Sequence, residues 1–174
     1  MRFMLVGSVF LIGIASAKAE ESCTAGFLPV LCMKVTITGD ATLSGPTSMA
    51  VNALTCADWA SGITPGGKGK LEFRSEFTPI DGTQFALEGQ VEGYQGPGFY
   101  EAESLAGWGS PFMVLVDQTR WENWVIDTAP AGASLKIAAD GSGTLNFNGF
   151  ITDHAAPPPH KAISGNVTWT CVDP

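Results

Sequence analysis

The chain has 174 residues, with 9 basic and 17 acidic side chains and a formal net charge of −8. This length suits one domain with a real core, and a composition that is 45% hydrophobic and 15% charged excludes an intrinsically disordered protein. The acidity argues against a nucleic-acid-binding module, which would carry a basic stripe, and against charge-driven docking on anionic lipid. Glycine and proline, with 21 and 11 residues, are in excess and predict many turns.

The N-terminal segment has the pattern of an export signal. Arg2 precedes an apolar run over residues 4–14, and Ala17-Lys18-Ala19 then fits the small-residue cleavage rule. We therefore predict a signal peptide over residues 1–19 and a single domain over residues 20–174. The alternatives are cleavage after Ala17 and an uncleaved N-terminal anchor. Cleavage after Ala19 removes Arg2 and Lys18 but no acid, so the charge becomes −10.

Export changes how the four cysteines are interpreted. Cys23, Cys32, Cys56 and Cys171 are an even number, which in an oxidising compartment predicts two disulfides. Three pairings are available. We favour Cys23–Cys32, closing a short N-terminal loop, and Cys56–Cys171, tying an early strand to the last one. A metal site is disfavoured because the sequence has no C-x-x-C spacing and its two histidines are remote, so we expect no metal and no cofactor.

The remaining sequence reads as a succession of strands, most of them alternating between apolar and polar residues. In chain order, we predict strands over residues 33–43, 48–58, 70–78, 83–92, 112–117, 121–127, 134–139, 143–152 and 162–172. The turn Ile80-Asp81-Gly82 is expected to join the third and fourth strands, because Asp-Gly is a strong hairpin signal. Residues 140–143 are expected to form a second hairpin turn. No window shows convincing helical periodicity.

About nine strands separated by turns predict an all-β protein, either a sandwich or a barrel. We prefer a disulfide-tied antiparallel β-sandwich, immunoglobulin-like or similar. The reason is that Trp169 and Cys171 share the inward face of the last strand. A bridge from Cys171 to Cys56 beside a buried tryptophan would pin two sheets together.

Several short motifs resemble a group of small exported bacterial β-sandwich proteins. They are GKLEF at residues 69–73, YQGPGFY at 94–100, GSGTL at 141–145 and ISGNVTWTC at 163–171. The named proteins that these motifs resemble are mycobacterial 19-kilodalton-antigen-like lipoproteins, although this chain lacks their lipid-anchoring cysteine. The resemblance implies a surface or secreted protein and supplies no catalytic residues.

Catalytic motifs are not evident in the sequence. Glu101 and Glu103 would lie about 7 Å apart on an extended chain, which fits an inverting glycosidase on distance alone. His154 and His160 flank a proline-rich turn, and Asp153 could orient one of them. We interpret these groups as solvated loop and strand residues, so we expect the protein not to be an enzyme; a polysaccharide hydrolase is the less favoured alternative.

Aromatic residues in the middle third of the chain are the best sign of binding. They are Tyr94, Phe99, Tyr100, Trp108, Trp121 and Trp124. An exposed tryptophan near Trp108 and Tyr100 could stack on a sugar ring or meet a protein. We select Tyr94, Tyr100, Trp108, Trp121 and Trp124 as candidate ligand-binding residues. The competing interpretation is that most of these rings fill the core.

Two non-enzymatic hypotheses follow for this acidic protein. The favoured one is an extracellular, periplasmic or surface binding module for a glycan, lipid or protein ligand, with no nucleic-acid partner. The alternative is a structural subunit that associates with its own kind. That alternative relies on the apolar N-terminal segment over residues 27–31, which lies beside an expected edge strand and could add to a neighbour.

Overall fold

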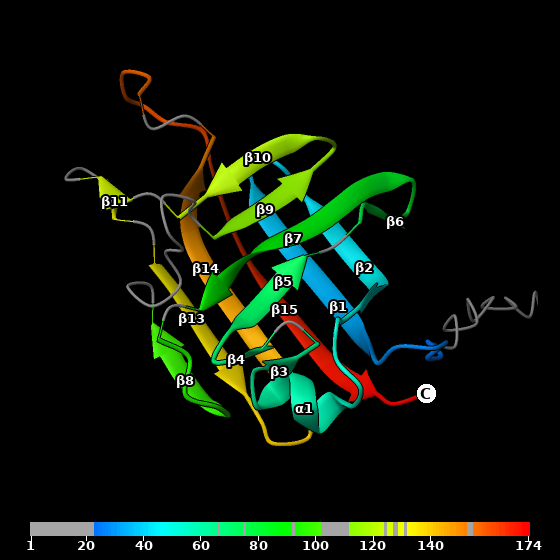
Figure 1. Ribbon diagram of the computed structural model, residues 1–174. Coiled ribbons are helices and arrows are strands. Elements are labelled where there is room, and N and C mark those ends of the chain that lie inside the picture. The colour runs from blue at the N-terminus through cyan, green and yellow to red at the C-terminus, as the bar shows by residue number, and fades with distance from the viewer. Residues whose placement is uncertain are drawn as a thin grey trace, which may run out of the picture.

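We describe the protein from a computed structural model (Figure 1). The structure describes residues 23–65, 67–74, 76–91, 93–101, 112–123, 125–126, 129–130, 132–152 and 155–174. The predicted signal peptide, Trp108, Trp124, Glu103 and His154 lie outside these described residues.

Strands form nearly all of the regular structure. They are β1 (Val30–Gly39), β2 (Leu43–Ala50), β3 (Ile63–Thr64), β4 (Gly67–Lys68), β5 (Leu71–Arg74), β6 (Thr78–Ile80), β7 (Thr83–Val91), β8 (Gly98–Glu101), β9 (Met113–Val116), β10 (Thr119–Glu122), β11 (Val125–Ile126), β12 (Ala129–Pro130), β13 (Gly132–Ile137), β14 (Gly143–Ile151) and β15 (Ala162–Val172). One short helix, α1 (Cys56–Ala60), is found among the described residues.

Eleven of the described strands belong to one antiparallel sheet. Its main path runs β2-β1-β15-β14-β10-β9-β7-β5; β13 pairs with β14 and β8, and β6 pairs with β7. The all-β, antiparallel and disulfide-bonded character is therefore as predicted, but the two separate sheets of a sandwich are not. A single hydrogen-bonded sheet curls around the core instead (Figure 1).

The change of direction within β14 explains this continuity. Its first part pairs with β13, whereas Ile151 at its end pairs with Glu122 of β10. A register shift separates Phe147 from Phe150, and Gly149 within it has a φ of 69°. Such a bulge bends a strand and suits glycine, so β14 can belong to both halves of the curled sheet.

The curl brings β6 beside β2. The Thr47 hydroxyl of β2 donates a hydrogen bond to the Thr78 hydroxyl oxygen of β6 at 2.7 Å. Figure 1 shows these two strands next to each other, although β2 is at one end of the sheet path and β6 pairs with β7 near the other end. The core therefore lies inside a half-barrel, whose two sides come together where β6 lies beside β2.

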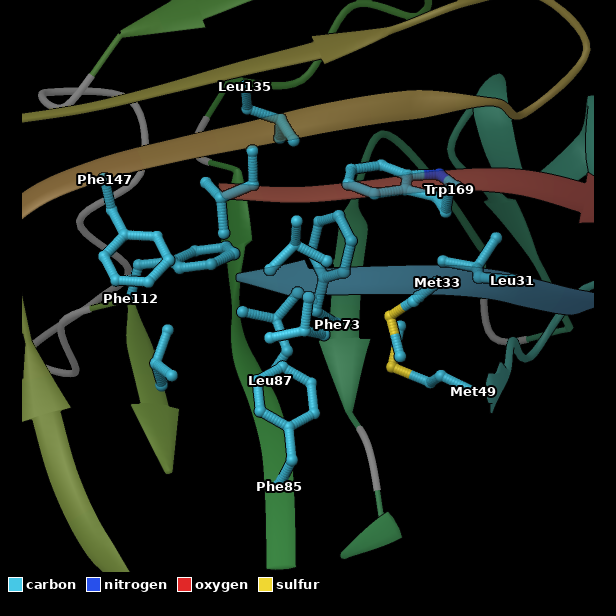
Figure 2. Packing of buried hydrophobic residues seen from close by; sticks show 14 of the residues in the cluster. Leu31, Met33, Met49, Phe73, Phe85, Leu87, Phe112, Leu135, Phe147 and Trp169 are labelled. Atoms are coloured by element: carbon cyan, nitrogen blue, oxygen red, sulfur yellow. The ribbon is translucent and has the colours of Figure 1, made fainter. Parts of the chain in front are cut away.

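Alternation in the strands produces that core, as the sequence predicted. Inward residues of β1, β5, β7, β14 and β15 meet in one cluster, part of which Figure 2 shows. At its centre, Phe73 lies edge-on to Trp59, Trp169 and Phe112, with ring centroids 5.5, 5.7 and 5.5 Å apart. Each such aromatic pair adds about 0.5–1.5 kcal/mol beyond the burial of its area. Phe77, which alternation along the predicted strand over residues 70–78 would place on the same face as Phe73, is 43% exposed instead.

Glycine is required where Phe147 packs against β15. A Cβ on Gly165 would lie 2.6 Å from the Phe147 ring and 2.5 Å from the Thr36 carbonyl oxygen of β1. Real Cβ atoms do not approach so closely, so any larger residue would push β15 away from its neighbours. Gly165 thus allows three neighbouring strands to close over a phenylalanine.

The predicted strand over residues 48–58 is wrong in its second half. β2 ends at Ala50, and Cys56 begins helix α1. Thr55 caps this helix: its hydroxyl accepts a hydrogen bond from the Asp58 amide at 3.0 Å and donates one to the Asp58 carboxylate at 2.8 Å. This reciprocal capping stabilises a helical turn, and Trp59 on that turn enters the core.

Both hairpin turns occur where they were predicted. Ile80 pairs with Thr83 across Asp81 and Gly82, whose φ values of 48° and 85° are those of a tight two-residue turn. Ile137 pairs with Gly143 across the second turn. One predicted strand is divided, however, because β5 and β6 are separate strands that pair with different parts of β7.

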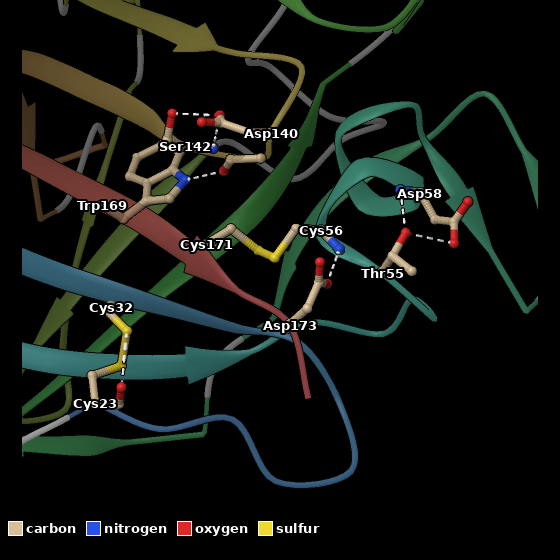
Figure 3. Close-up of a disulfide and its surroundings, with 11 residues drawn as sticks. Cys23, Cys32, Thr55, Cys56, Asp58, Asp140, Ser142, Trp169, Cys171 and Asp173 are labelled. Atoms are coloured by element: carbon tan, nitrogen blue, oxygen red, sulfur yellow. Dashed lines mark hydrogen bonds between the residues drawn. A yellow bond between two sulfur atoms is a disulfide. The ribbon is translucent and has the colours of Figure 1, made fainter.

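The two disulfides join Cys23 to Cys32 and Cys56 to Cys171, which is the favoured pairing (Figure 3). The second bridge ties helix α1 to β15 rather than a strand to a strand. Within the part of the chain that the structure describes, no helix has the length and apolar character needed to cross a membrane.

Candidate functional site

A groove of about 960 Å³ lies against one end of the sheet, beside the Cys23–Cys32 disulfide. Its described lining comprises residues 23–24, 32–34 of β1, 45–48 of β2, 78–79 of β6 and 168–170 of β15. Three adjacent strands, β2, β1 and β15, thus meet the N-terminal segment and β6 in one hollow. The groove is therefore a candidate binding surface built from described residues.

The disulfide positions one wall of this groove. Cys32 lies on the outward side of β1, and its bond to Cys23 holds the chain that precedes the strand against the sheet (Figure 3). The hydrogen bond between Thr47 and Thr78 holds β6 beside the edge strand β2, next to the groove. Both walls are therefore fixed to a rigid sheet, as a binding site requires.

Hydroxyl groups and one amine give the groove its chemistry. Thr24, Ser48, Thr168 and Thr170 supply hydroxyls, which can donate and accept hydrogen bonds. Lys34 supplies the only charge among the described lining residues, which include no Asp, Glu or His. In a chain with a net charge of −8, such a lining favours ligands that are neutral or negatively charged.

The same chemistry continues across the sheet. We call the outward side chains of β2, β1, β15, β14, β13 and β8 the acid-poor face, because Glu101 is the only acidic residue among them. The acids of the described chain lie instead on turns, on α1, near the C-terminus and on strands of the other half, such as Glu72 and Glu88. The charges of the described residues are thus distributed very unevenly.

Strand register aligns the acid-poor face into rows. One row runs through Pro46, Lys34, Thr168, Thr144, Lys136 and Phe99. The next row runs through Ser44, Thr36, Asn166, Asn146, Ser134 and Glu101. The first of these, which we call the Lys34–Lys136 row, begins in the groove and ends at a Phe99 ring that is 62% exposed.

Side-chain hydrogen bonds fix part of the acid-poor face. The Asn166 amide nitrogen donates to the Asn146 side-chain oxygen at 2.7 Å, directly across the β14–β15 ladder. The Ser164 hydroxyl donates to the side-chain oxygen of Asn148 at 2.6 Å. Groups that are already ordered lose less conformational entropy when a ligand binds.

The predicted aromatic patch does not form from the residues that can be located. Trp121 and Tyr94 are buried, with only 3% and 5% of their surface exposed, so their rings are not offered to a ligand. Tyr100 is partly buried and lies against Tyr94, with ring centroids 5.2 Å apart. Trp121 and Tyr94 thus belong to the core, and Tyr100 packs against it. Trp108 and Trp124 lie outside the described residues.

Hydrogen bonds give the two tyrosines structural roles. The Tyr94 hydroxyl donates to the Ala60 carbonyl at the end of α1, and the Tyr100 hydroxyl donates to the Gly96 carbonyl at 2.5 Å. Burial, together with the neighbouring Tyr100, holds the pKa of Tyr94 well above its usual value. Tyr94 therefore anchors the helix to the sheet as a neutral phenol.

The other candidate groups are not gathered into a site by the described residues. Glu101 lies at the end of β8, opposite Ser134 of β13, and its predicted partner Glu103 is outside the described residues. His160 is described, whereas His154 is not. Within the described ranges, no cluster of His, Cys, Asp and Glu side chains could hold a metal ion.

The groove and the acid-poor face were missed by the sequence reasoning. Their residues are ordinary outward Ser, Thr, Asn and Lys positions, which read simply as the solvated side of strands. A usable signal was nevertheless present, because the segments at 33–43, 134–139, 143–152 and 162–172 carry almost no acids in an acidic chain.

Comparison with protein families, with curated proteins and with solved structures finds no match for the chain.

Proposed function

We propose that the protein is an exported, non-enzymatic binding module that holds a glycan in the groove beside the Cys23–Cys32 disulfide. The observation that carries this proposal is the groove's described lining, which offers hydroxyls and one amine and no carboxylate or imidazole. Hydroxyls and amines recognise polyhydroxylated ligands, whereas acid-base hydrolysis needs a carboxylate or an imidazole beside the reacting bond.

The disulfides support the location part of the proposal. Two bridges and no free cysteine in the described chain are compatible with an extracellular or periplasmic environment, where disulfides persist. The N-terminal pattern is that of a segment removed on export. The groove would then face a compartment that is rich in cell-surface and extracellular polysaccharides.

A glycan fits the groove better than a lipid does. The apolar residues of the described lining are Met33, Pro46, Pro79 and Trp169, and the groove is open rather than an enclosed pocket for an acyl chain. Pro46 and Pro79 instead offer short apolar surfaces against which the C–H face of a sugar ring can pack, while neighbouring hydroxyls bind its edges.

Titration calorimetry on the chain over residues 20–174 tests this proposal. Oligosaccharides of glucose, N-acetylglucosamine and galacturonate serve as the probes, and we expect at least one to bind. Lys34→Ala should weaken that binding about fivefold to tenfold, because a charge-assisted hydrogen bond is lost. Lys161→Ala, an exposed lysine outside the groove, is the matched control and should leave affinity unchanged.

A parallel measurement separates folding from binding. Chemical-shift changes on addition of the bound oligosaccharide should map to residues 32–34, 45–48 and 168–170 of the folded protein. Absence of binding to every probe, or binding that Lys34→Ala leaves intact, would overturn the assignment of the groove.

A second candidate function is self-assembly, and one feature favours it. Phe27, Leu28 and Leu54 are exposed large hydrophobic residues, with 103%, 42% and 78% of their surface accessible. The Val51 amide donates to the Pro29 carbonyl at 2.9 Å, so the segments carrying these residues run together at the same end of β1 and β2. Exposed apolar groups gathered in this way mark contact surfaces.

Sedimentation velocity tests the assembly candidate. If a second copy covers this surface, the wild-type chain should show concentration-dependent association that the Phe27→Ser, Leu54→Ser double variant abolishes. Phe99→Ser, a change of another exposed aromatic at a different edge, is the control. A wild-type chain that remains monomeric throughout would exclude this candidate.

A further inference from the structure

We infer that the ligand is a linear, acidic polysaccharide that lies across the strands along the Lys34–Lys136 row. This inference rests on the proposed function, since it starts from the groove and extends the same ligand. It adds the length, the direction and the charge of that ligand. Each of these three properties follows from a separate observation.

Length and direction follow from strand register. Pro46 pairs with Lys34, Lys34 with Thr168, and the pairing continues through Thr144 and Lys136 to Phe99. Six neighbouring strands, spaced by about 4.8 Å, make this row about 24 Å long. Several linked sugars fit such a length, whereas a monosaccharide would touch only the groove.

Charge follows from the distribution of ionic residues. Lys34 and Lys136 lie in one row, three strand spacings and hence about 14 Å apart. Both are exposed, and neither forms an ion pair with a described carboxylate. By contrast, the described arginines Arg74 and Arg120 are each paired with a glutamate. Unpaired lysines on a face with one acid attract a carboxylate-bearing chain, while the acidic remainder of the protein repels it.

Hydrogen-bonding groups lie along the row and beside it. Thr168 and Thr144 separate the two lysines, and the neighbouring row presents the ordered Asn166–Asn146 pair. Sugar hydroxyls can donate to and accept from these side chains, as they can in the groove. The exposed Phe99 ring at the far end offers an apolar surface for the C–H face of a terminal sugar.

A nucleic acid is the other linear polyanion, and the charges disfavour it. Duplex DNA carries a phosphate about every 3.4 Å along each of its strands. Proteins that bind single strands use a positively charged groove with stacking aromatics. The Lys34–Lys136 row has two cations and one exposed aromatic in a protein of net charge −8. A uronate polymer spaces its charges by a sugar ring and supplies hydroxyls between them.

The test is calorimetry with galacturonate oligomers of increasing length. Affinity should rise with length until the oligomer reaches from Lys34 to Lys136, and then level off. Lys136→Ala should weaken binding of long oligomers about twofold to fivefold and leave the dimer unchanged. Glu101→Gln should tighten binding of the longest oligomers, because it removes the one acid of the face, and Lys161→Ala should change neither.

The outcomes separate this inference from the proposed function. Failure of every oligosaccharide to bind, the shortest included, would refute the groove itself. Binding that is independent of oligomer length, or loss of dimer affinity in Lys136→Ala, would overturn only the extended site. Equal affinity for glucose oligomers of the same length would overturn the acidic ligand, and so would equal affinity for single-stranded DNA.

Discussion

The indole Nε1 of Trp169 donates a hydrogen bond to the Gly141 carbonyl oxygen at 2.9 Å (Figure 3). This bond joins the last strand to the turn between β13 and β14. The same turn packs against the Cys56–Cys171 disulfide, since a Cβ on Gly141 would lie 3.0 Å from that of Cys171. Trp169 therefore connects β15 to the turn between β13 and β14, and this turn contacts the Cys56–Cys171 disulfide that holds α1.

Replacing Trp169 by Phe tests this coupling. The Gly141 carbonyl loses its buried donor and the smaller ring leaves space, so the free energy of unfolding should fall by about 2–4 kcal/mol. Denaturant unfolding measures the change. Thr170→Val, at an exposed position on the same strand, is the control and should shift stability by less than about 0.5 kcal/mol.

The two disulfides should differ in their contributions. Cys56–Cys171 spans 115 residues and Cys23–Cys32 spans 9. In the chain-entropy model their removal costs about 4–5 and about 2–3 kcal/mol, respectively. Paired cysteine-to-alanine variants, compared by denaturant unfolding, should follow that order.

The loss of oligosaccharide affinity should be larger when Cys23–Cys32 is removed than when Cys56–Cys171 is removed, because only the shorter bridge borders the groove. Equal losses of affinity in the two variants would contradict a role of the shorter bridge in the groove.

Asp140 should make stability depend on pH. Hydrogen bonds from the Ser142 hydroxyl and amide, at 2.6 and 2.9 Å, lower the pKa of Asp140 below its usual value. A lowered folded-state pKa adds stability above the unfolded-state pKa, near 3.8, which is lost as pH falls through the folded-state value. Wild type should therefore exceed Asp140→Asn in stability at neutral pH, and the difference should shrink as the pH falls below that unfolded-state value.

Gly165→Ala tests the close approach of β15 to β1. The added methyl group collides with Phe147 and with the Thr36 carbonyl, so unfolding should become easier by about 1–3 kcal/mol. Thermal unfolding provides the measurement. Gly132→Ala is the matched control, because a Cβ there meets nothing within 4 Å. Because Gly→Ala at an unstrained position restricts the unfolded chain and so stabilises the fold, a similar loss in both variants would contradict the collision.

Period-2 alternation predicted most of the sheet because each strand buries one face. β15 begins and ends as predicted, and Phe85, Leu87 and Trp169 point inward. The helix cap at Thr55 was not predicted from the sequence. A threonine followed three residues later by an aspartate favours the start of a helix over a strand. The continuity of the sheet depends on the bulge in β14. It also depends on the pairing of β14 with β10, which joins only Ile151 to Glu122 and so leaves no pattern in the sequence.

The candidate site was predicted less well than the fold. Aromatic composition could not distinguish a core ring from an exposed one, and Trp121 and Tyr94 are core rings. Lys34 and Lys136 are separated by more than 100 residues, and only the register of the intervening strands brings them into one row. Such a row is a property of strand pairing, which a single sequence does not specify.

The central place of β15 has a consequence for the order of folding. This strand lies between β1 and β14, and its last residues pair with the first residues of β1, Val30 with Val172. Until those final residues are available, the sheet is in two parts and the ring of Trp169 is missing from the core. Contacts so distant in sequence form slowly. A chain of this topology would therefore complete its sheet only after β15, its last strand, is available for pairing.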